Sequence, residues 1–197
     1  MSALPPLDDE LEGGCYSNGR WVQGCLAPWH PTDDAKVQAS LEAAGLRPAD
    51  LLLELGCGDG KICRAAATGF GCRAVGVELD AAMVEVARER LVDLPPGPRS
   101  LVEIRQGDLL DEAVTMTEPP ATCVTMYLMP DHYQKLEPLL EAYFSAGVRL
   151  IVYAWELKGE HWRHRLVKEG PGWWLYHIPS NDGSAGDSGG GIPTGVP

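Results

Sequence analysis

The ten residues from Leu51 to Gly60 (LLLELGCGDG) constrain the fold of this 197-residue chain more than any other stretch. Four leucines and one acid, Glu54, are typical of a buried strand, and glycines then occupy every second position. The pattern becomes helical directly after Asp59. Such a turn brings backbone N–H groups close to a ligand, because a Cβ atom at Gly56 or Gly58 would keep the ligand away. The run therefore predicts a ligand-binding strand–helix turn.

Two common phosphate-binding fingerprints do not match this turn. A P-loop needs a glycine five positions before its Gly-Lys pair and a Ser or Thr after it, but Leu55 and Ile62 stand there. The dinucleotide fingerprint needs a third glycine where the chain has Lys61. It also favours an uncharged strand, because pyrophosphate already brings negative charge to the turn, whereas this strand carries Glu54. The acid favours a ligand with positive charge, so a nicotinamide-dependent oxidoreductase is disfavoured.

Strand and helix patterns alternate along the chain, which is typical of a parallel sheet covered by helices. Thr32 is expected to cap the first helix, and the Pro-Gly pair at 171–172 predicts a closing hairpin. The predicted fold is α/β, a doubly wound and mainly parallel seven-stranded sheet with an antiparallel terminal hairpin. Helices are expected at 32–45, 59–68, 81–91 and 132–144, and strands at 51–55, 73–78, 101–105, 123–126, 148–153, 165–168 and 173–178.

The two ends of the chain differ in composition from its middle. Residues 1–14 are acidic and contain prolines, and residues 180–197 are rich in Gly, Ser and Pro. We expect a flexible acidic lead at 1–14, one domain at 15–179 and a disordered tail at 180–197.

Charge and cysteine content narrow the class of partner. The net charge of −12 argues against nucleic acid as the main partner, because phosphate binding needs an excess of Lys and Arg. An acidic surface would still attract a basic protein substrate. Six scattered cysteines predict buried thiols in a reducing compartment, and Cys15, Cys25 and His30 match no usual zinc spacing, so we expect no metal. Without a secretory pattern or an uninterrupted apolar span, a cytoplasmic protein that does not bind membranes is expected.

Two further carboxylates follow the next two predicted strands. Glu78 ends its strand, where a carboxylate can accept from both hydroxyls of a ribose, and Leu79 would lie beside a purine face. Asp108 can accept from an adenine amino group, and the backbone N–H of Leu109 can donate to a ring nitrogen. In a doubly wound sheet these turns face one crevice at the carboxyl ends of the strands. The order of the motifs therefore predicts a nucleoside site.

From about Trp29 to Pro179 the chain resembles class I S-adenosylmethionine (SAM)-dependent methyltransferases, which implies a Rossmann-like fold and SAM as the cofactor. The segments Pro31-Thr32, Leu55–Lys61 (LGCGDGK) and Tyr127–Asp131 (YLMPD) resemble a small bacterial and eukaryotic subgroup. That subgroup includes the mitochondrial lysine methyltransferases of the ATP synthase c subunit and the adenine nucleotide translocase. The resemblance implies that Thr32 lies over the amino-acid end of SAM. The residues expected to bind SAM are Thr32, Glu54, Gly56, Gly58, Asp59, Glu78, Leu79, Asp108, Leu109 and Met126.

The methyl acceptor is expected to meet the segments that follow the fourth and fifth strands. Tyr127 is a candidate for orienting the incoming nucleophile, and Glu156 is a candidate for holding an amine. In-line displacement needs positioning more than acid–base chemistry, although a lysine must first lose its proton. The resemblance implies a protein lysine as acceptor. A small metabolite, and a SAM-binding regulatory protein without turnover, remain alternatives.

Overall fold

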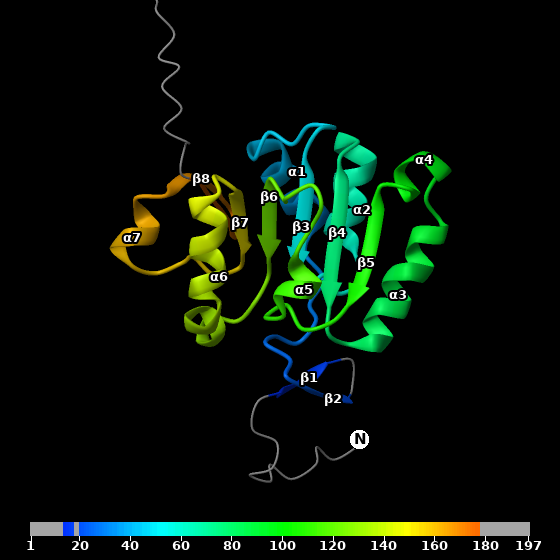
Figure 1. The fold of residues 1–197 in the computed structure, drawn as a ribbon, viewed down its shortest axis with the longest axis horizontal. Helices are drawn as coiled ribbons and strands as arrows, with labels where there is room; N and C mark the ends of the chain where they lie inside the picture. Colours follow the sequence, from blue (N-terminus) through cyan, green and yellow to red (C-terminus); the bar gives the residue numbers. More distant parts are fainter. Residues whose placement is uncertain (1–13, 18–19, 178–197) are drawn as a thin grey trace, which may run out of the picture.

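The computed structural model describes residues 14–17 and 20–177, arranged around one central sheet (Figure 1). Its seven strands have the order β5-β4-β3-β6-β7-β9-β8. Neighbours from β5 to β7 are parallel, whereas β9 runs antiparallel to both β7 and β8. The predicted fold class and terminal hairpin are confirmed. The expected lead and tail lie outside the described residues, apart from Gly14, which begins β1.

The predicted strands and long helices agree with the structure to within a few residues. The strands are β1 (Gly14–Ser17), β2 (Arg20–Gln23), β3 (Leu51–Leu55), β4 (Arg73–Glu78), β5 (Val102–Gln106), β6 (Cys123–Met126), β7 (Arg149–Tyr153), β8 (Leu166–Gly170) and β9 (Trp173–Tyr176). The helices are α1 (Asp34–Ala43), α2 (Lys61–Ala65), the π-helix η2 (Ala66–Phe70), α3 (Ala81–Val92), α4 (Pro96–Arg99), α5 (Glu112–Thr115), the 3-10 helix η3 (Pro130–His132), α6 (Tyr133–Ser145) and α7 (Glu160–Arg163).

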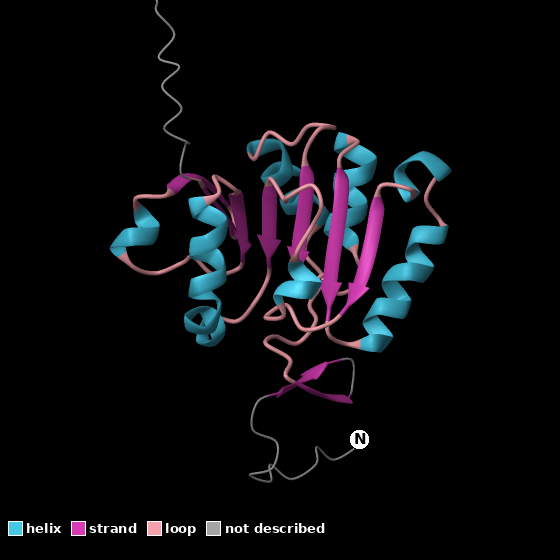
Figure 2. Cartoon of the chain, in the orientation of Figure 1, coloured by secondary structure: helices cyan, strands magenta, loops and turns pink. Residues whose placement is uncertain are grey.

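Both faces of the sheet are covered by helices, as Figure 2 shows. Side chains alternate along β3, so Leu52 packs in one apolar cluster with α1, α2 and α3, while Leu51, Leu53 and Leu55 pack in a second cluster with α6. All five residues of β3 are buried. This explains the nearly continuous apolar run in the sequence, because a parallel strand covered on both faces needs no polar alternation.

Several local predictions need correction. The cap of α1 is Asp33, whose carboxylate accepts from the backbone N–H of Lys36, and not Thr32. The helix after the glycine turn is interrupted, because α2 passes into the π-helix η2. The antiparallel β1–β2 hairpin and the one-turn helices α4, α5 and α7 were not predicted, since segments of four residues are too short to show a period. No helix in the described part of the chain is long and apolar enough to cross a bilayer.

The sheet order fixes where a ligand can bind. The chain runs from β3 outward through β4 to β5, and then returns to place β6 on the other side of β3. The carboxyl ends of β3 and β6 therefore form the point where the strand order reverses, which is the usual ligand crevice of such sheets. In Figure 1 the β1–β2 hairpin lies beyond this same edge.

Candidate functional site

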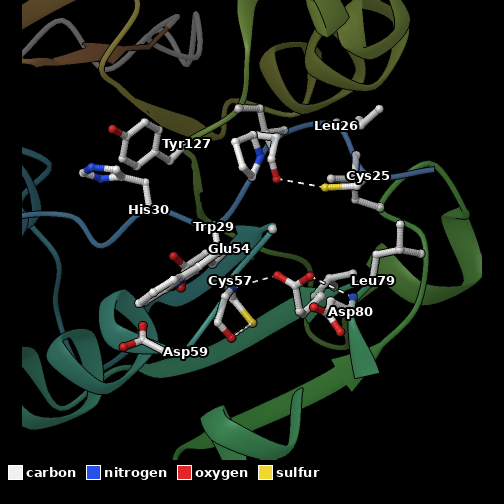
Figure 3. Close-up of a pocket in the computed structure, with 18 of the residues that line it drawn as sticks. Cys25, Leu26, Trp29, His30, Glu54, Cys57, Asp59, Leu79, Asp80 and Tyr127 are labelled. Carbon is white, nitrogen blue, oxygen red and sulfur yellow. Dashed lines mark hydrogen bonds between the residues drawn. The ribbon is translucent and has the colours of Figure 1, made fainter. Parts of the chain in front are cut away.

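A cavity of about 210 Å³ opens at the carboxyl ends of β3, β4, β5 and β6. Its wall combines the glycine turn after β3, the ends of the next strands and the segment from Gly24 to Thr32 (Figure 3). Every predicted cofactor residue except Met126 lines this cavity. Sequence order and sheet topology thus bring the predicted site together in one place.

The glycine turn has left-handed backbone at three positions. The φ angles of Gly56, Gly58 and Gly60 are +77°, +52° and +71°, a region that side-chain-bearing residues rarely adopt. A Cβ atom built on Gly58 would lie 2.2 Å from Cδ1 of Trp29. Glycine is therefore required here both by the backbone conformation and by the close approach of Trp29.

The backbone N–H groups of this turn do not face the cavity as expected. Those of Gly56 and Cys57 both donate to the carbonyl of Val77 at 2.9 Å, and that of Gly58 donates to the Glu78 carboxylate at 2.8 Å. An anion-binding loop would present these donors to a phosphate. Because the amides are satisfied within the protein while carboxylates line the cavity, the site suits a ligand with positive charge.

Glu78 connects the two turns that enclose the cavity. Oε2 of its carboxylate accepts from the Gly58 amide, and Oε1 accepts from the Asp80 amide at 2.9 Å. Burial raises the pKa of Glu78, and these two amide donors oppose that shift. Each oxygen keeps a further lone pair, which matches the predicted acceptance of two ribose hydroxyls. Leu79 follows directly in the cavity wall.

Glu54 is a buried acid at the end of β3. Its Oε2 accepts from the Cys63 thiol at 3.1 Å, and burial raises its pKa to about 8. The Cys63 hydrogen bond lowers this pKa, whereas the nearby Glu78 charge raises it further. A buried carboxyl with so high a pKa is protonated at neutral pH unless a cation stabilises its charge. The ammonium or sulfonium of SAM is such a cation, so Glu54 matches the cofactor that the sequence predicts.

Asp108 and Leu109 line the same cavity from the turn after β5. The Asp108 carboxylate accepts from the Leu110 amide at 2.9 Å, which closes the turn, and the group remains exposed at the cavity wall. The Leu109 side chain is buried. The adenine contacts of these two residues stay a prediction.

Asp59 is held by cationic side chains. Its buried carboxylate forms an ion pair with Arg90 of α3 and lies 4.0 Å from Arg64 of α2. Its Oδ1 also accepts from the Lys61 amide at 3.1 Å. The carboxylate therefore joins α2 to α3 beneath the turn, and a direct contact with the cofactor stays a prediction.

The stretch from Gly24 to His30 is the part of the cavity wall that the sequence did not reveal, whereas Thr32 directly after it was predicted. Trp29 packs against Gly58, and the Thr32 carbonyl accepts from Nζ of Lys61 at 2.9 Å. The same ammonium forms an ion pair with Asp34 at 2.8 Å. Lys61 thus ties this segment to the start of α2, directly after the glycine turn, and the position of Thr32 over the amino-acid end of SAM stays a prediction. The only sequence signal was an aromatic pair between two prolines (PWHP).

The two predicted acceptor-side residues separate in the structure. Tyr127 lines the cavity, but Glu156 lies in an adjacent cavity between α6 and the loop that precedes α7. Trp155 takes its place in the main cavity wall. Met126 is fully buried in the core beneath the sheet, so its side chain does not reach the cofactor cavity.

The cysteines do not form a reactive centre. Burial raises the pKa of the Cys57 and Cys63 thiols well above the usual value, so neither is a nucleophile. Both pack on Gly76 of β4, where a Cβ atom would lie 2.7 Å from Sγ of Cys57. In contrast to the expectation of free thiols throughout, Cys25 is disulfide-bonded. Cys57, Cys63, Cys72 and Cys123 are free and buried.

Comparison with known proteins identifies what these features are similar to. Residues 54–164 match the family model described as the ANTKMT methyltransferase domain. A protein-lysine N-methyltransferase of Saccharolobus islandicus is 34% identical over 134 residues, which cover 67% of this chain and 79% of that protein.

Solved structures give the same fold. An RNA methyltransferase from Salinibacter ruber in complex with S-adenosyl-L-homocysteine is 34% identical, with a TM-score of 0.63, covering 77% of this chain and 95% of that chain. A geranyl diphosphate methyltransferase in complex with SAM is 25% identical, with a TM-score of 0.50, covering 60% of this chain and 47% of that chain.

Proposed function

This chain belongs to the family of the ANTKMT methyltransferase domain and is a SAM-dependent methyltransferase, and from that premise we propose that its acceptor is the side-chain amine of a protein lysine. The bound cofactor supplies an electrophilic methyl group. The described residues bind and orient it: Glu78 at the ribose, Asp108 at the adenine and Glu54 at the cationic end. Positioning of this kind can supply several kcal/mol of barrier reduction, out of the roughly 7–11 kcal/mol available to ideal orientation.

The charge around the cavity is the observation that supports a protein acceptor over RNA. Lys61 is the only lysine or arginine among the described residues that line the cavity, and Asp34 and the Thr32 carbonyl already engage its ammonium. The whole chain carries a net charge of −12. RNA binding requires cations along the backbone path. A lysine-bearing, basic protein is instead attracted to this surface.

Two similar proteins have names that suggest different acceptors. The Saccharolobus islandicus protein is called a protein-lysine methyltransferase, and the Salinibacter ruber structure is called an RNA methyltransferase, each at 34% identity. Identity alone does not separate them, whereas the charge of this cavity favours the first. We accordingly expect no nucleic-acid partner and retain the cytoplasm as the proposed location.

Labelling of a cell extract tests the acceptor class. The purified chain is incubated with extract and tritiated-methyl SAM, and the label is then measured separately in protein, RNA and small molecules. Label concentrated in protein and removed by protease supports the proposal. Label removed by ribonuclease, or recovered with small molecules, overturns it. A Glu78→Ala variant is the control, since its weakened cofactor binding should reduce label in any true acceptor.

A further inference from the structure

The cavity has a second end, built from three rings that lie far apart in the sequence. His30 comes from the segment between Gly24 and Thr32, Tyr127 follows β6 and Trp155 follows β7, and all three line the cavity. The Tyr127 ring centroid lies 6.1 Å from that of His30 and 5.8 Å from that of Trp155. Figure 3 shows His30 and Tyr127 together on one side of the pocket, apart from Leu79 and Asp80. We infer that His30, Tyr127 and Trp155 form the subsite that holds the alkyl-ammonium chain of the acceptor lysine.

An unusual backbone conformation directs Trp155 into this wall. Ala154 has a φ of +66°, the only positive φ among the described residues other than glycine. Its N–H donates to the Gly172 carbonyl at 3.0 Å, and the Trp155 N–H donates to the Tyr153 carbonyl at 2.9 Å. The Tyr133 hydroxyl donates to the Trp155 carbonyl at 3.2 Å. Several hydrogen bonds therefore maintain a strained turn, a pattern typical of functional positions.

Packing alone does not account for the position of Trp155. Its side chain is 37% exposed at the cavity, whereas the neighbouring Tyr153 is fully buried and bonds to the Ser40 hydroxyl at 2.7 Å. Tyr153 therefore belongs to the core, and its ring supports Tyr127 from below at 6.4 Å between centroids. The exposed face of Trp155 is left for a ligand.

The charge distribution favours a lysine side chain at this end. The carboxylates of the cavity wall are Glu54, Asp59, Glu78, Asp80 and Asp108, all at the ends of β3 and β4 or in the turns after β3, β4 and β5. Among the described residues, none of the segments that carry the three rings adds a carboxylate to the wall. Ring faces attract an alkyl-ammonium group, while an apolar wall without a carboxylate lowers the pKa of that group. The subsite can thus bind the chain and still permit loss of the proton before transfer.

Ring geometry distinguishes this subsite from a base-stacking site. Tyr127 is inclined by 57° to His30 and by 58° to Trp155. A flat nucleobase is held best on a parallel ring face, whereas an alkyl-ammonium chain is enclosed by rings at steep angles. This inference rests on the proposed function, because it names the residues that would recognise the lysine.

Binding of a small probe tests the subsite without turnover. With the cofactor site filled by S-adenosylhomocysteine, the amide of Nα-acetyl-trimethyl-lysine is titrated into the protein and its methyl resonance is followed by NMR. Ring currents should shift this resonance upfield. The dissociation constant of the neutral norleucine analogue should be up to about fivefold higher than that of the trimethyl-lysine probe. Trp155→Ala and His30→Ala should abolish the shift, and Trp155→Phe should largely retain it. His161→Ala, which changes a half-exposed ring outside this cavity, is the matched control and should behave as wild type.

The outcomes separate this inference from the proposed function. The dissociation constant of each variant for S-adenosylhomocysteine must first lie within about twofold of the wild-type value. If Trp155→Ala does not fold, His30→Ala replaces it in the test, because His30 is exposed and its loss should disturb folding little. Equal shifts in wild type and in the ring variants overturn the subsite, even if the extract label is found in protein lysine. Binding of adenosine monophosphate to the rings in place of the trimethyl-lysine probe also overturns it. Label found only in RNA overturns the proposed function, whereas the NMR titration of the ring variants still decides whether the three rings bind an alkyl-ammonium group.

Discussion

The Glu78 carboxylate accepts a hydrogen bond from the Gly58 backbone amide at 2.8 Å, and this contact ties the end of β4 to the glycine turn after β3. The same carboxylate also accepts from the Asp80 amide. One half-buried side chain thus fixes both turns, and we predict that its remaining lone pairs accept from the ribose hydroxyls of the cofactor.

Replacement of Glu78 by alanine should weaken SAM binding by about 1.5–3 kcal/mol, or roughly 10- to 150-fold, since charge-assisted hydrogen bonds to the ribose are lost. Isothermal titration with S-adenosylhomocysteine measures the change. Glu78→Gln should lose less, because the amide oxygen can still accept one bond. An unchanged dissociation constant for Glu78→Ala would refute the ribose assignment.

Gly58→Ala should weaken cofactor binding and lower the melting temperature, because the new Cβ atom collides with Trp29 in a left-handed backbone. Gly147→Ala is the matched control: its φ is +72°, but no atom lies within 4 Å of the added Cβ. The control should cost only the backbone strain, about 1 kcal/mol. A Gly58→Ala/Trp29→Ala double variant should regain part of the lost stability. Equal losses of stability in Gly58→Ala and Gly147→Ala would show that Trp29 is not packed on the turn.

The stability of the unliganded protein should depend on the ionisation of Glu54. Burial raises its pKa from 4.5 to about 8, so the folded state binds this proton more tightly than the unfolded state. The stabilisation that this proton adds to the free energy of unfolding is complete below pH 4.5. It is lost as the pH rises toward 8, at a rate of up to about 1.4 kcal/mol per pH unit. Urea unfolding at several pH values measures this trend, and Glu54→Gln should reduce the slope. Identical slopes in the two proteins would contradict a buried, protonated Glu54.

Removal of the Lys61 ammonium should loosen the segment between Gly24 and Thr32, which lines the cavity. Lys61→Met loses the bond to the Thr32 carbonyl and the ion pair with Asp34, so SAM affinity should fall by about three- to tenfold. Asp34→Asn removes only an exposed ion pair and should change affinity by less than about threefold. Lys36→Met, at an exposed position of α1, is the control. Wild-type affinity in Lys61→Met, measured by the same titration, would show that the tether does not support the site.

Sequence reasoning succeeded where local pattern and topology determine the outcome. The apolar run of β3 follows from strand burial. The order of motifs identified Glu54, one residue before the end of β3, and Glu78, the last residue of β4, and both acids line the cavity. It failed where a contact joins distant segments. Trp29 meets Gly58 across 29 positions from a proline-flanked segment that has no period.

Two errors at the acceptor end have a geometric cause. Met126 is the last residue of β6 and its side chain still points into the core, so the cavity wall begins at Tyr127. After β7, the chain bends at Ala154, which has a positive φ, and Trp155 instead of Glu156 lines the cavity. A left-handed alanine cannot be recognised from residue type, because alanine rarely adopts that conformation.

The identity of the methylated residue is the most direct measurement of the central claim. Protein labelled by the wild-type chain is digested to amino acids and analysed by mass spectrometry alongside a reaction with Glu78→Ala. We expect Nε-methylated lysine that depends on active wild-type protein and is strongly reduced in the variant. Methylated arginine, histidine or nucleosides without methyl-lysine would contradict the assignment of this chain as a protein-lysine methyltransferase.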